Sequence, residues 1–435
     1  MHTHVYSPSF SKNSLMTRLL STCASMLLLL GVSAQGTQPC SSNISGKDCL
    51  SLNTITTAVP FLMISPDSRA GGMGDAGVAV SPDVNAIHWN PSKLAFVEDE
   101  FQFDISYSPW LRNLVNDMNL AYLALYYRLP NKKSTIAGSL RYFSLGSITF
   151  TDINGGVIRD FTPKEFSVDV AFAQQFSDVF SGGIAIRYIN SNLTGGTSVQ
   201  GAASKAGQSV AADVSFFYRK QDLQLGEKDG EFSFGFNVSN IGAKMRYTET
   251  SETDFIPINL RLGPCLKVDM DEYNSIAFNI DINKLLVPTP PIYGDSLDDD
   301  GNREIVSGQD PNVGIAAGMF GSFSDAPGQV TKDEDGNITV EPGSRTSEEF
   351  REVNLAGGFE YWYAKQFAFR GGYFWEHATK GNRKYFTLGA GLRYNVFAID
   401  LSYLIASSQQ SPLANTLRFT LGFHFNSLKA KKKED

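Results

Sequence analysis

This chain has few histidines and cysteines, and their spacing does not match a known catalytic or metal-binding motif. Apart from two histidines at the N-terminus, the chain has His88, His377 and His424. No His-Glu-x-x-His pair and no closely paired cysteines at zinc spacing occur in the sequence. A Gly-x-Ser-x-Gly elbow followed by an acid and a histidine is also missing. The sequence therefore predicts a protein without a catalytic centre, a metal or a cofactor.

Two acidic runs, 298–302 and 333–337, both contain Asp-x-Asp-Gly-Asn. Closely spaced carboxylates can hold calcium, and glycine allows the sharp turn that such a loop needs. Neither run has Glu six residues after its glycine, where an EF-hand would place it. We interpret both runs as solvated Asp-Gly turns, with calcium binding as the alternative.

Residues 72–77 contain the spacing Gly-x-Gly-x-x-Gly of a dinucleotide-binding loop. That loop requires a strand before it and a helix after it within one βαβ unit, and the surrounding sequence predicts neither. We interpret these glycines as positions where backbone segments pack closely together.

The composition and net charge of the chain exclude several classes of protein. The chain has 435 residues, of which 42% are hydrophobic, 12% aromatic and 19% charged, with a formal net charge of -8. A sequence pI near 5.3 argues against electrostatic binding of nucleic acid. No apolar run reaches the roughly 18 residues of a membrane-spanning helix, which excludes a polytopic helical membrane protein. Two or three soluble domains or one large closed sheet remain.

The N-terminus has the features of a secretory signal peptide. Lys12 and Arg18 precede the apolar block 26–32, and small residues follow at the cleavage position, so we expect residues 1–34 to be removed. Export to an oxidising compartment makes a disulfide between Cys40 and Cys49 plausible, and Cys265 has no nearby partner.

From Phe101 to Phe425 the sequence alternates between apolar residues and small or polar residues. In the first segment Phe101, Phe103, Ile105 and Tyr107 alternate with Gln, Asp and Ser. Because successive side chains of a strand point to opposite faces, each segment has one apolar and one polar face. The pattern predicts fourteen strands, at 101–108, 118–129, 135–145, 164–176, 182–190, 208–220, 231–241, 257–270, 275–285, 353–361, 366–375, 384–394, 396–405 and 415–425.

Short and long connections alternate along the series of strands, which is typical of an outer-membrane barrel. A soluble β-sandwich also alternates, but its strands average about 5–6 residues, whereas many segments here approach the 9–11 needed to cross a bilayer. We therefore predict an all-β fold, a 14-stranded antiparallel transmembrane β-barrel at 101–425 with both termini at the periplasmic end. Residues 35–100 form a periplasmic N-terminal segment and plug, and 426–435 form a charged periplasmic tail. Aromatic residues near the strand ends are expected to form the interfacial girdle, namely Tyr126, Tyr127, Tyr142, Tyr188, Tyr361, Trp362, Tyr373 and Tyr394.

The longest connection, 286–352, is the strongest functional signal that the pattern provides. A loop above about 12–15 residues without structure is usually functional or disordered. This loop carries Ile292 and Tyr293 near its start and Met319, Phe320 and Phe323 further on. Apolar residues on an acidic extracellular surface indicate a protein-binding patch or a cap on the pore, and folding inward as a lid is the alternative.

The N-terminal part of the chain resembles a known family of barrels. Residues 68–77 read SRAGGMGDAG, 85–91 read NAIHWNP, 106–111 read SYSPWL and 318–328 read GMFGSFSDAPG. These segments resemble the PorV family of outer-membrane shuttles of the type IX secretion system, within the superfamily of long-chain fatty-acid-transporter-like barrels. The superfamily has fourteen strands and an N-terminal hatch with an Asn-Pro-Ala motif. At that position this sequence has Asn90 and Pro91, with Ser92 where alanine is usual.

The resemblance implies a binding protein without catalysis. It implies that the barrel binds the C-terminal signal domain of exported cargo at its extracellular end. It further implies that cargo is collected from the type IX translocon barrel and passed to an attachment complex with a sortase-like protease. Outer-membrane lipid is the remaining expected partner. Combined with loop chemistry, the resemblance suggests as cargo anchors Trp110, Leu111, Ile292, Tyr293, Met319, Phe320 and Phe323.

The same resemblance places Arg69, Asn85, Asn90 and Pro91 in a plug that closes the barrel from the periplasmic side. Asparagine side chains can satisfy plug backbone inside the barrel, where water is scarce. The alternative function, from a different class, is an outer-membrane transporter for hydrophobic small molecules such as long-chain fatty acids, in which the plug moves aside. A transporter needs an apolar path through the barrel, whereas a shuttle needs a docking surface for a protein domain.

Overall fold

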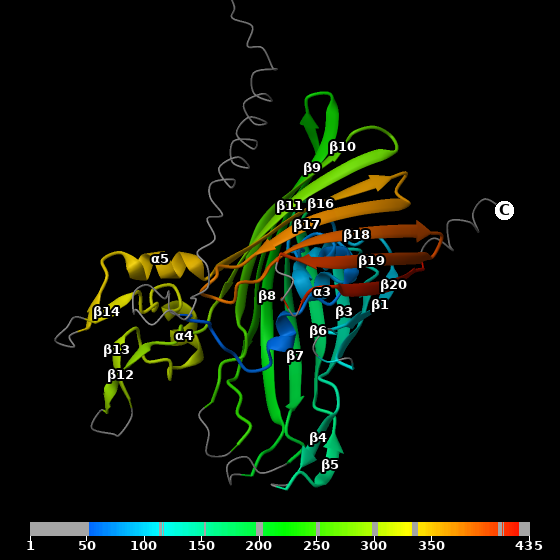
Figure 1. The fold of residues 1–435 in the computed structure, drawn as a ribbon. Helices are drawn as coiled ribbons and strands as arrows, with labels where there is room; N and C mark the ends of the chain where they lie inside the picture. Colours follow the sequence, from blue (N-terminus) through cyan, green and yellow to red (C-terminus); the bar gives the residue numbers. More distant parts are fainter. Residues whose placement is uncertain are drawn as a thin grey trace, which may run out of the picture.

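The computed structural model describes residues 52–425 except 113–114, 116, 152–153, 197–202, 249–252, 298–302, 333–337, 408–410 and 412. Within these residues the chain forms a closed antiparallel barrel of fourteen strands (Figure 1). The first and last strands pair to close it, from Gln102 with His424 to Tyr107 with Phe419. The predicted fold class is thereby confirmed.

The barrel strands follow one another around the wall in chain order. They are β1 (Phe101–Pro109), β2 (Asn119–Arg128), β3 (Ser134–Ser144), β6 (Lys164–Ser177), β7 (Phe180–Asn192), β8 (Gly207–Leu225), β9 (Lys228–Gly242), β10 (Asn259–Asp269), β11 (Asn274–Leu285), β16 (Val353–Tyr363), β17 (Phe367–Trp375), β18 (Lys384–Tyr394), β19 (Phe397–Ala406) and β20 (Thr416–His424). Each coincides with a strand expected from the sequence. The largest difference is the β8–β9 hairpin, which continues well beyond the expected 208–220 and 231–241.

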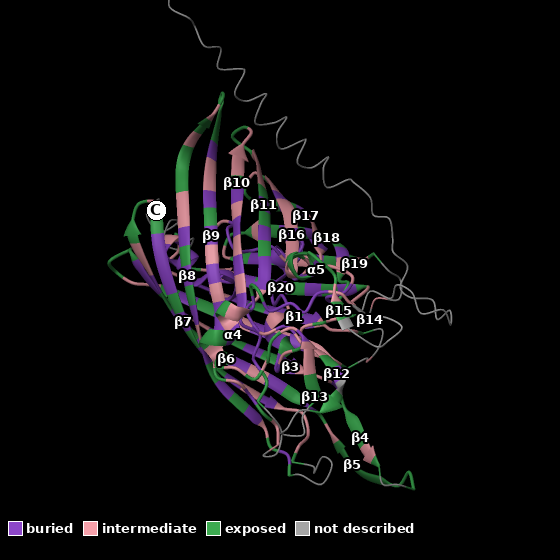
Figure 2. Cartoon of the chain, turned by 90° about the vertical axis from the view of Figure 1, so that its left-hand side faces the viewer, coloured by how far each residue is buried: buried purple, intermediate pink, exposed green. Residues whose placement is uncertain are grey.

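The alternation of side chains gives the barrel an apolar exterior and a polar interior. In β1, Ile105 is 50% exposed and Tyr107 is 48% exposed, while Asp104 and Ser106 between them are buried. The same alternation of buried and exposed positions runs along the other strands (Figure 2). A soluble sandwich would place the apolar side chains inside, so this arrangement is that of a barrel in lipid.

Two residues of the expected aromatic girdle face the barrel interior instead. Tyr126 is buried in an apolar cluster with residues of the N-terminal segment. Trp362 lies beneath Arg393, whose guanidinium carbon is 4.4 Å from the ring centroid. Both residues follow the inward period of their strands, so proximity to a strand end was not sufficient to place them at the interface.

The two ends of the barrel differ in their connections. Six short turns lie at the turn end, between the strands that follow one another from β2 to β19. At the opposite end, which we call the long-loop end, the connections contain additional elements. These are β4 (Ile148–Thr151), β5 (Val157–Phe161), β12 (Ile292–Leu297), β13 (Arg303–Ser307), α4 (Ile315–Gly321), β14 (Val330–Lys332), β15 (Ile338–Val340) and α5 (Ser344–Arg351). The connection 286–352 is therefore a structured lobe in its described parts, whereas the sequence suggested a loop without structure (Figure 1).

The N-terminal segment passes through the barrel from one end to the other. Its short helices are η1 (Pro60–Met63), α2 (Ser68–Gly71), α3 (Ala86–Trp89) and η2 (Pro91–Phe96), and Figure 1 shows them inside the barrel. The segment starts at the long-loop end, where the Asn53 amide donates to the Thr379 carbonyl at 3.1 Å. It leaves at the turn end, where the Arg128 amide donates to the Glu100 carbonyl at 2.8 Å.

The first and last described residues lie at opposite ends of the barrel, whereas the two chain termini themselves lie outside the described residues, so their common periplasmic position stays a prediction. Phe425 is at the turn end, where its amide donates to the Phe101 carbonyl. Asn53 is at the long-loop end. The periodicity of the sequence predicts the strands. It contains no information on the direction in which the non-periodic N-terminal segment runs through the barrel, because that direction depends on tertiary contacts.

Several expectations fall on residues that the structure does not describe. These are the signal peptide 1–34, the disulfide of Cys40 and Cys49, the acidic runs 298–302 and 333–337, and the tail 426–435. Cys265 is described, and it is buried with a free thiol. No helix within the described residues has the length and apolar character needed to cross a membrane.

Candidate docking surface and the filled lumen

The N-terminal segment packs against the barrel wall through glycines on both sides. Gly74 has φ +75, and a Cβ at this position would lie 2.7 Å from the backbone nitrogen of Tyr373 in β17. A Cβ on Gly372 of the same strand would lie 2.1 Å from the backbone carbonyl carbon of Met73. Side chains at these positions would push the plug off the wall, so the glycines of 72–77 serve close packing, in agreement with our interpretation of this motif.

A chain of buried charges joins the plug to three strands. The Arg69 guanidinium donates to both carboxylate oxygens of Glu360 on β16, at 2.9 and 2.7 Å. It also pairs with Asp83 in the plug at 2.7 Å. Glu360 in turn accepts from Arg370 on β17 at 2.8 Å, and Arg370 pairs with Asp400 on β19 at 2.6 Å. Removing one partner of such a buried pair typically costs 3–5 kcal/mol, because the other charge is left without compensation.

Two aspartates anchor the glycine-rich turn of the plug. Asp75 pairs with Arg418 on β20 at 2.7 Å and accepts from the Tyr385 hydroxyl at 2.5 Å. Asp281 on β11 accepts the backbone amides of Gly77 and Val78 at 2.8 and 2.9 Å. Backbone polar groups that water cannot reach are thus paired with side chains of the wall, as a non-helical segment at membrane depth requires.

The expected plug residues Asn85, Asn90 and Pro91 lie buried in the part of the segment nearer the turn end. Asn85 donates to Asp104 on β1 at 2.8 Å. Asn90 donates to the Val78 carbonyl at 3.0 Å and to the Phe216 carbonyl on β8 at 3.1 Å. Pro91 begins η2, a position where a missing backbone N–H is tolerated. The Asn-Pro pair therefore ends one helix, begins the next and bonds to the wall.

The long-loop end is closed by an apolar cluster, which we call the cap. Phe61 and Leu62 of the N-terminal segment meet residues from the ends of β2, β3, β7 and β8 and from the connections after β9 and β11. Its buried members are Ala58, Val59, Phe61, Leu62, Leu120, Phe143, Ile189, Ala211, Met245, Phe255, Ile256, Ile258, Leu286 and Val287. The cap lies above the plug, so side chains fill the interior at this level as well.

Of the seven expected cargo anchors, Phe320 and Phe323 are the most exposed. Phe320 in α4 is 78% exposed, and Phe323 immediately after α4 is 51% exposed. Tyr293 in β12 is 42% exposed. We call Phe320 and Phe323 the α4 surface. It belongs to the lobe that protrudes from one side of the long-loop end (Figure 1).

The other expected anchors are less available to a partner. Trp110 and Met319 pack against the cap, while Leu111 and Ile292 are only partly exposed. Met319 thus joins the exposed α4 surface to the cap through neighbouring residues of one helix. The sequence left open whether the connection 286–352 exposes a binding patch or folds inward as a lid. The structure shows inward folding for its first residues, which join the cap, and an outward-facing α4 surface.

Sequence reasoning missed several exposed apolar residues at the same end, among them Leu297 in β12, which is 65% exposed. Phe350 in α5 is 73% exposed, and Val157 and Ile158 in β5 are 70% and 65% exposed. Phe350 stands alone in the charged helix SRTSEEFR, and β5 lies in a connection for which the sequence predicts no strand. A signal was present for β5, since Val157 and Ile158 are adjacent apolar residues in a connection that also contains Ile148, Phe150 and Phe161.

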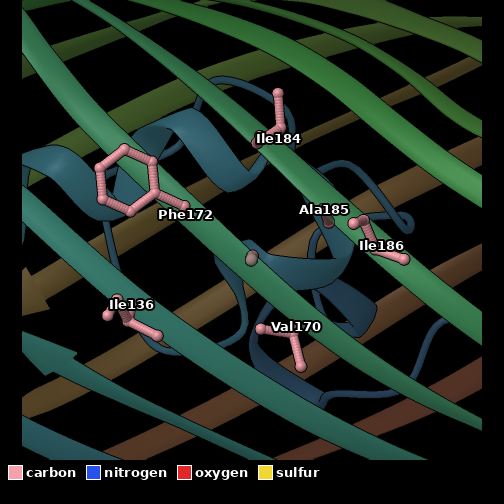
Figure 3. Close-up of a pocket in the computed structure, with 7 residues that line it drawn as sticks. Ile136, Val170, Phe172, Ile184, Ala185 and Ile186 are labelled. Carbon is pink, nitrogen blue, oxygen red and sulfur yellow. The ribbon is translucent and has the colours of Figure 1, made fainter.

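The structure also has an apolar groove on the outer wall of the barrel (Figure 3). It has a volume of about 250 Å³ and is formed by side chains of β3, β6 and β7. The lining residues are Ile136, Val170, Ala171, Phe172, Ile184, Ala185 and Ile186. The groove faces outward, like the lipid-facing residues around it, and is separate from the interior that the plug occupies.

Comparison with known proteins adds to this geometry. Residues 48–292 match the model of the family described as type IX secretion system protein PorV. The match covers more than half of the chain. The chain belongs to this family. It is therefore an outer-membrane barrel of the type IX secretion system, and its role in that system is that of a shuttle.

Solved structures similar to this PorV-family chain include transporter barrels, and no curated protein sequence matches it. The toluene transporter TbuX of Ralstonia pickettii is 10% identical, with 83% of this chain and 98% of that chain covered and a TM-score of 0.44. The toluene transporter TodX of Pseudomonas putida is 11% identical, with 86% and 98% covered and a TM-score of 0.42. A Pseudomonas aeruginosa FadL homologue is 12% identical, with 86% and 100% covered and a TM-score of 0.41. Likenesses of this degree do not identify a substrate.

Proposed function

We propose that this PorV-family barrel binds the C-terminal signal domain of exported cargo at its long-loop end, without catalysing a reaction. In this proposal it receives cargo from the type IX translocon barrel and passes it to an attachment complex that contains a sortase-like protease. The observation that supports the proposal is the α4 surface. Phe320 and Phe323 are exposed there, next to a helix residue that is fixed in the cap.

Exposed aromatic residues on a fixed support are what a protein-binding site needs. Large apolar side chains supply most of the energy of an interface, and rigid support reduces the entropy lost on binding. Met319 holds α4 against the cap, and the cap is continuous with the N-terminal segment. The α4 surface can therefore bind a partner without first folding.

A transporter for hydrophobic small molecules remains the alternative function. It would require the plug to leave the interior, where Arg69, Glu360, Arg370 and Asp400 hold it through consecutive ion pairs. It would also require an apolar path, whereas the wall behind the plug presents polar and charged side chains. The geometry supports docking at the barrel end better than passage through it.

The test of this function is purification of the tagged barrel from outer membranes, followed by mass spectrometry of the proteins that co-purify. We expect cargo with C-terminal signal domains, the translocon barrel and components of the attachment complex. A tagged variant with Phe320→Ala and Phe323→Ala should lose cargo and keep the assigned fold. Absence of all secretion components, together with loss of hydrophobic solute uptake in a deletion strain, would favour the transporter.

We further propose that the long-loop end faces the cell exterior and that the turn end, with Phe425, faces the periplasm. Long loops on the outside and short turns on the inside are usual for outer-membrane barrels. In intact cells a membrane-impermeant maleimide should label Asn382→Cys, in the connection between β17 and β18, and should spare Asp178→Cys in the turn between β6 and β7. Both side chains are exposed, so each should react in opened cells. The reverse pattern in intact cells would invert the assignment.

A further inference from the structure

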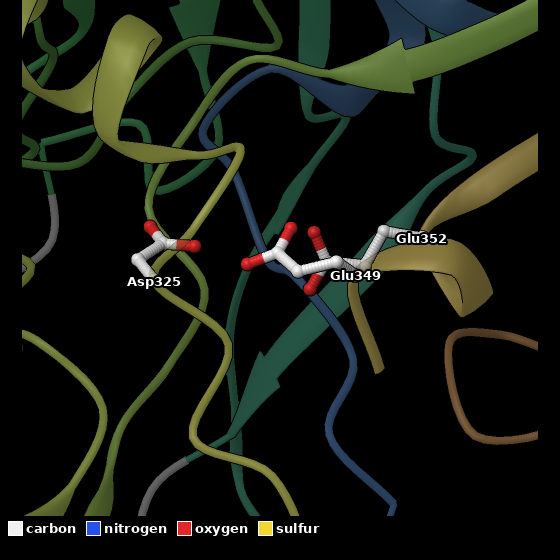
Figure 4. Close-up of side chains that lie close together, drawn as sticks. All are labelled: Asp325, Glu349 and Glu352. Atoms are coloured by element: carbon white, nitrogen blue, oxygen red, sulfur yellow. The ribbon is translucent and has the colours of Figure 1, made fainter. Parts of the chain in front are cut away.

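Three carboxylates converge inside the lobe at the long-loop end (Figure 4). Asp325 follows α4, Glu349 lies in α5, and Glu352 lies between α5 and β16. One oxygen from each residue lies within 4.8 Å of the others. Figure 4 shows the Asp325 carboxylate facing those of Glu349 and Glu352 across a short gap.

Positive charges compensate this cluster only in part. Lys284 pairs with Glu352 at 2.7 Å and with Glu349 at 3.3 Å. Lys380 pairs with Glu352 at 3.0 Å and with the adjacent Glu348 at 2.7 Å. Among the described residues these two lysines form salt bridges with three carboxylates, those of Glu348, Glu349 and Glu352. Asp325 is the fourth carboxylate of the group, so four negative charges face two positive ones, an excess of two negative charges. One divalent cation would balance that excess.

Asp325 is the residue that the lysines do not reach. It is 4% exposed, and its Oδ1 atom is buried without a hydrogen-bond partner among the described residues. Its Oδ2 atom accepts the Thr289 amide at 3.0 Å. A buried carboxylate oxygen without a donor is costly, and a cation is one of the few groups that can compensate it. Burial raises the pKa of Asp325 to about 6, and the charges of Glu352 and Glu349 add to the increase.

We propose that Asp325, Glu349 and Glu352 bind a calcium ion in the extracellular lobe. Calcium accepts six to eight oxygen ligands in flexible geometry, so three carboxylates from two segments, with backbone oxygens and water, suit it better than magnesium, which demands a regular octahedron. Lys284 pairs with the Oε2 atom of Glu352, and Lys380 pairs with its Oε1 atom. The Oδ1 atom of Asp325 has no hydrogen-bond partner among the described residues, so it supplies the free ligand.

The site would fasten the lobe to the barrel. Asp325 follows the α4 surface, Glu349 and Glu352 flank the end of α5, and Thr289 connects to both sides through Asp325 and Glu352. Asn53 of the N-terminal segment also donates to Glu348 in α5 at 3.0 Å. A bound cation should therefore reduce local opening of the segments that support Phe320 and Phe323. This consequence for cargo rests on the proposed function, whereas binding of the ion does not.

The test uses the full barrel purified in detergent and stripped of divalent ions with a chelator. Calcium chloride is titrated into the parent, Asp325→Asn and Glu349→Gln, and binding is followed by calorimetry and by proteolysis within the lobe. We expect the parent to bind with a dissociation constant of about 10⁻⁴–10⁻³ M, the range of extracellular calcium modules. Each variant should weaken binding at least about tenfold, because one charged ligand is lost.

The matched control is Glu341→Gln, which removes one exposed acid from the same lobe outside the cluster. It should bind calcium like the parent. A second control replaces the three acids of 333–335 with amides, because that run is the other calcium candidate of this lobe. Loss of binding in this second control alone, binding that survives both cluster variants, or no saturable binding by the parent would each overturn the proposal. Normal calcium binding by a parent barrel that binds no cargo signal domain would contradict only the proposed function.

Discussion

Replacement of Phe320 and Phe323 by alanine is expected to remove most cargo binding while the barrel remains intact. Both side chains are exposed in the absence of a partner, so their loss leaves no cavity in the fold. Buried aromatic anchors typically contribute 1–2 kcal/mol or more each to an interface, so the double variant should bind cargo about 30-fold more weakly or worse. Retention of a purified cargo signal domain on the immobilised barrel is the measurement.

The controls separate a specific site from general loss of exposed apolar surface. Val157→Ala combined with Ile158→Ala removes two comparably exposed residues from β5, at the same end of the barrel. Deletion of the acidic run 298–302 removes charge, which contributes weakly when it is exposed. Both controls should retain cargo, and all variants should show the heat-modifiable migration of a folded barrel. Parental binding by the Phe double variant, with loss on the acidic deletion, would rule out the hydrophobic site.

Phe350 provides a further check on the extent of the site. It is 73% exposed in α5, on the same lobe. If cargo covers the lobe as a whole, Phe350→Ala should weaken binding as well, whereas a site limited to α4 would leave this variant unaffected.

The barrel could be predicted from the sequence because the alternation of apolar and polar residues that marks each strand extends over only a few residues. Every second residue of a strand faces lipid, so a pair such as Asp104 and Ile105 reveals both faces within a few residues. The strand prediction holds also for β10 and β11, whose register runs unshifted from Asn259 with Leu285 to Asp269 with Ser275. Alternation and the even number of strands sufficed for the topology, since neighbouring strands pair in chain order.

The interior of the barrel could not be predicted in the same way, because its contacts are distant in sequence. Arg69 and Glu360 are 291 positions apart, and Asp75 and Arg418 are 343 positions apart. No local period marks either pair. The resemblance identified the plug residues, but the direction of the segment that contains them depends on contacts such as Asn53 with Thr379, which only the structure reveals.

The candidate docking site was predicted in part, for a physical reason. Apolar residues in a long polar loop either expose a binding surface or fold onto the barrel, and residue type alone does not distinguish the two outcomes. Phe320 is exposed, whereas its neighbour Met319 packs against the cap. The two side chains differ because successive residues of a helix point in different directions. Trp110 likewise packs on the cap.

Deletion of residues 69–92 is expected to convert the closed barrel into an open pore. The deleted stretch contains Arg69, the glycine-rich turn and the Asn-Pro pair, and its side chains and backbone fill the interior between β16–β20 and β8–β11. Without it, the inward-facing residues should line a water-filled channel, as in larger barrels with polar interiors. Planar bilayer recordings should show stable conductance steps that the parent lacks.

Point variants test whether the observed contacts, and not only the presence of the segment, keep the barrel closed. Gly372→Val would drive a side chain into the backbone of Met73, and Arg69→Ala would leave Glu360 and Asp83 without their shared partner. Cys265 reports the result, since its thiol faces the plug beside Met73 and Val78 and is buried.

Both variants should therefore increase maleimide labelling of Cys265 in the folded barrel. Gly138→Val should not, because a Cβ at Gly138 meets only the Asp169 carbonyl at 3.6 Å, an ordinary contact. If neither variant changes labelling and the deletion does not conduct, the segment is held by other contacts and does not seal the pore. If Cys265 reacts in the parent at the same rate, the plug already opens by itself, and passage of small hydrophobic molecules through the interior regains support over docking alone.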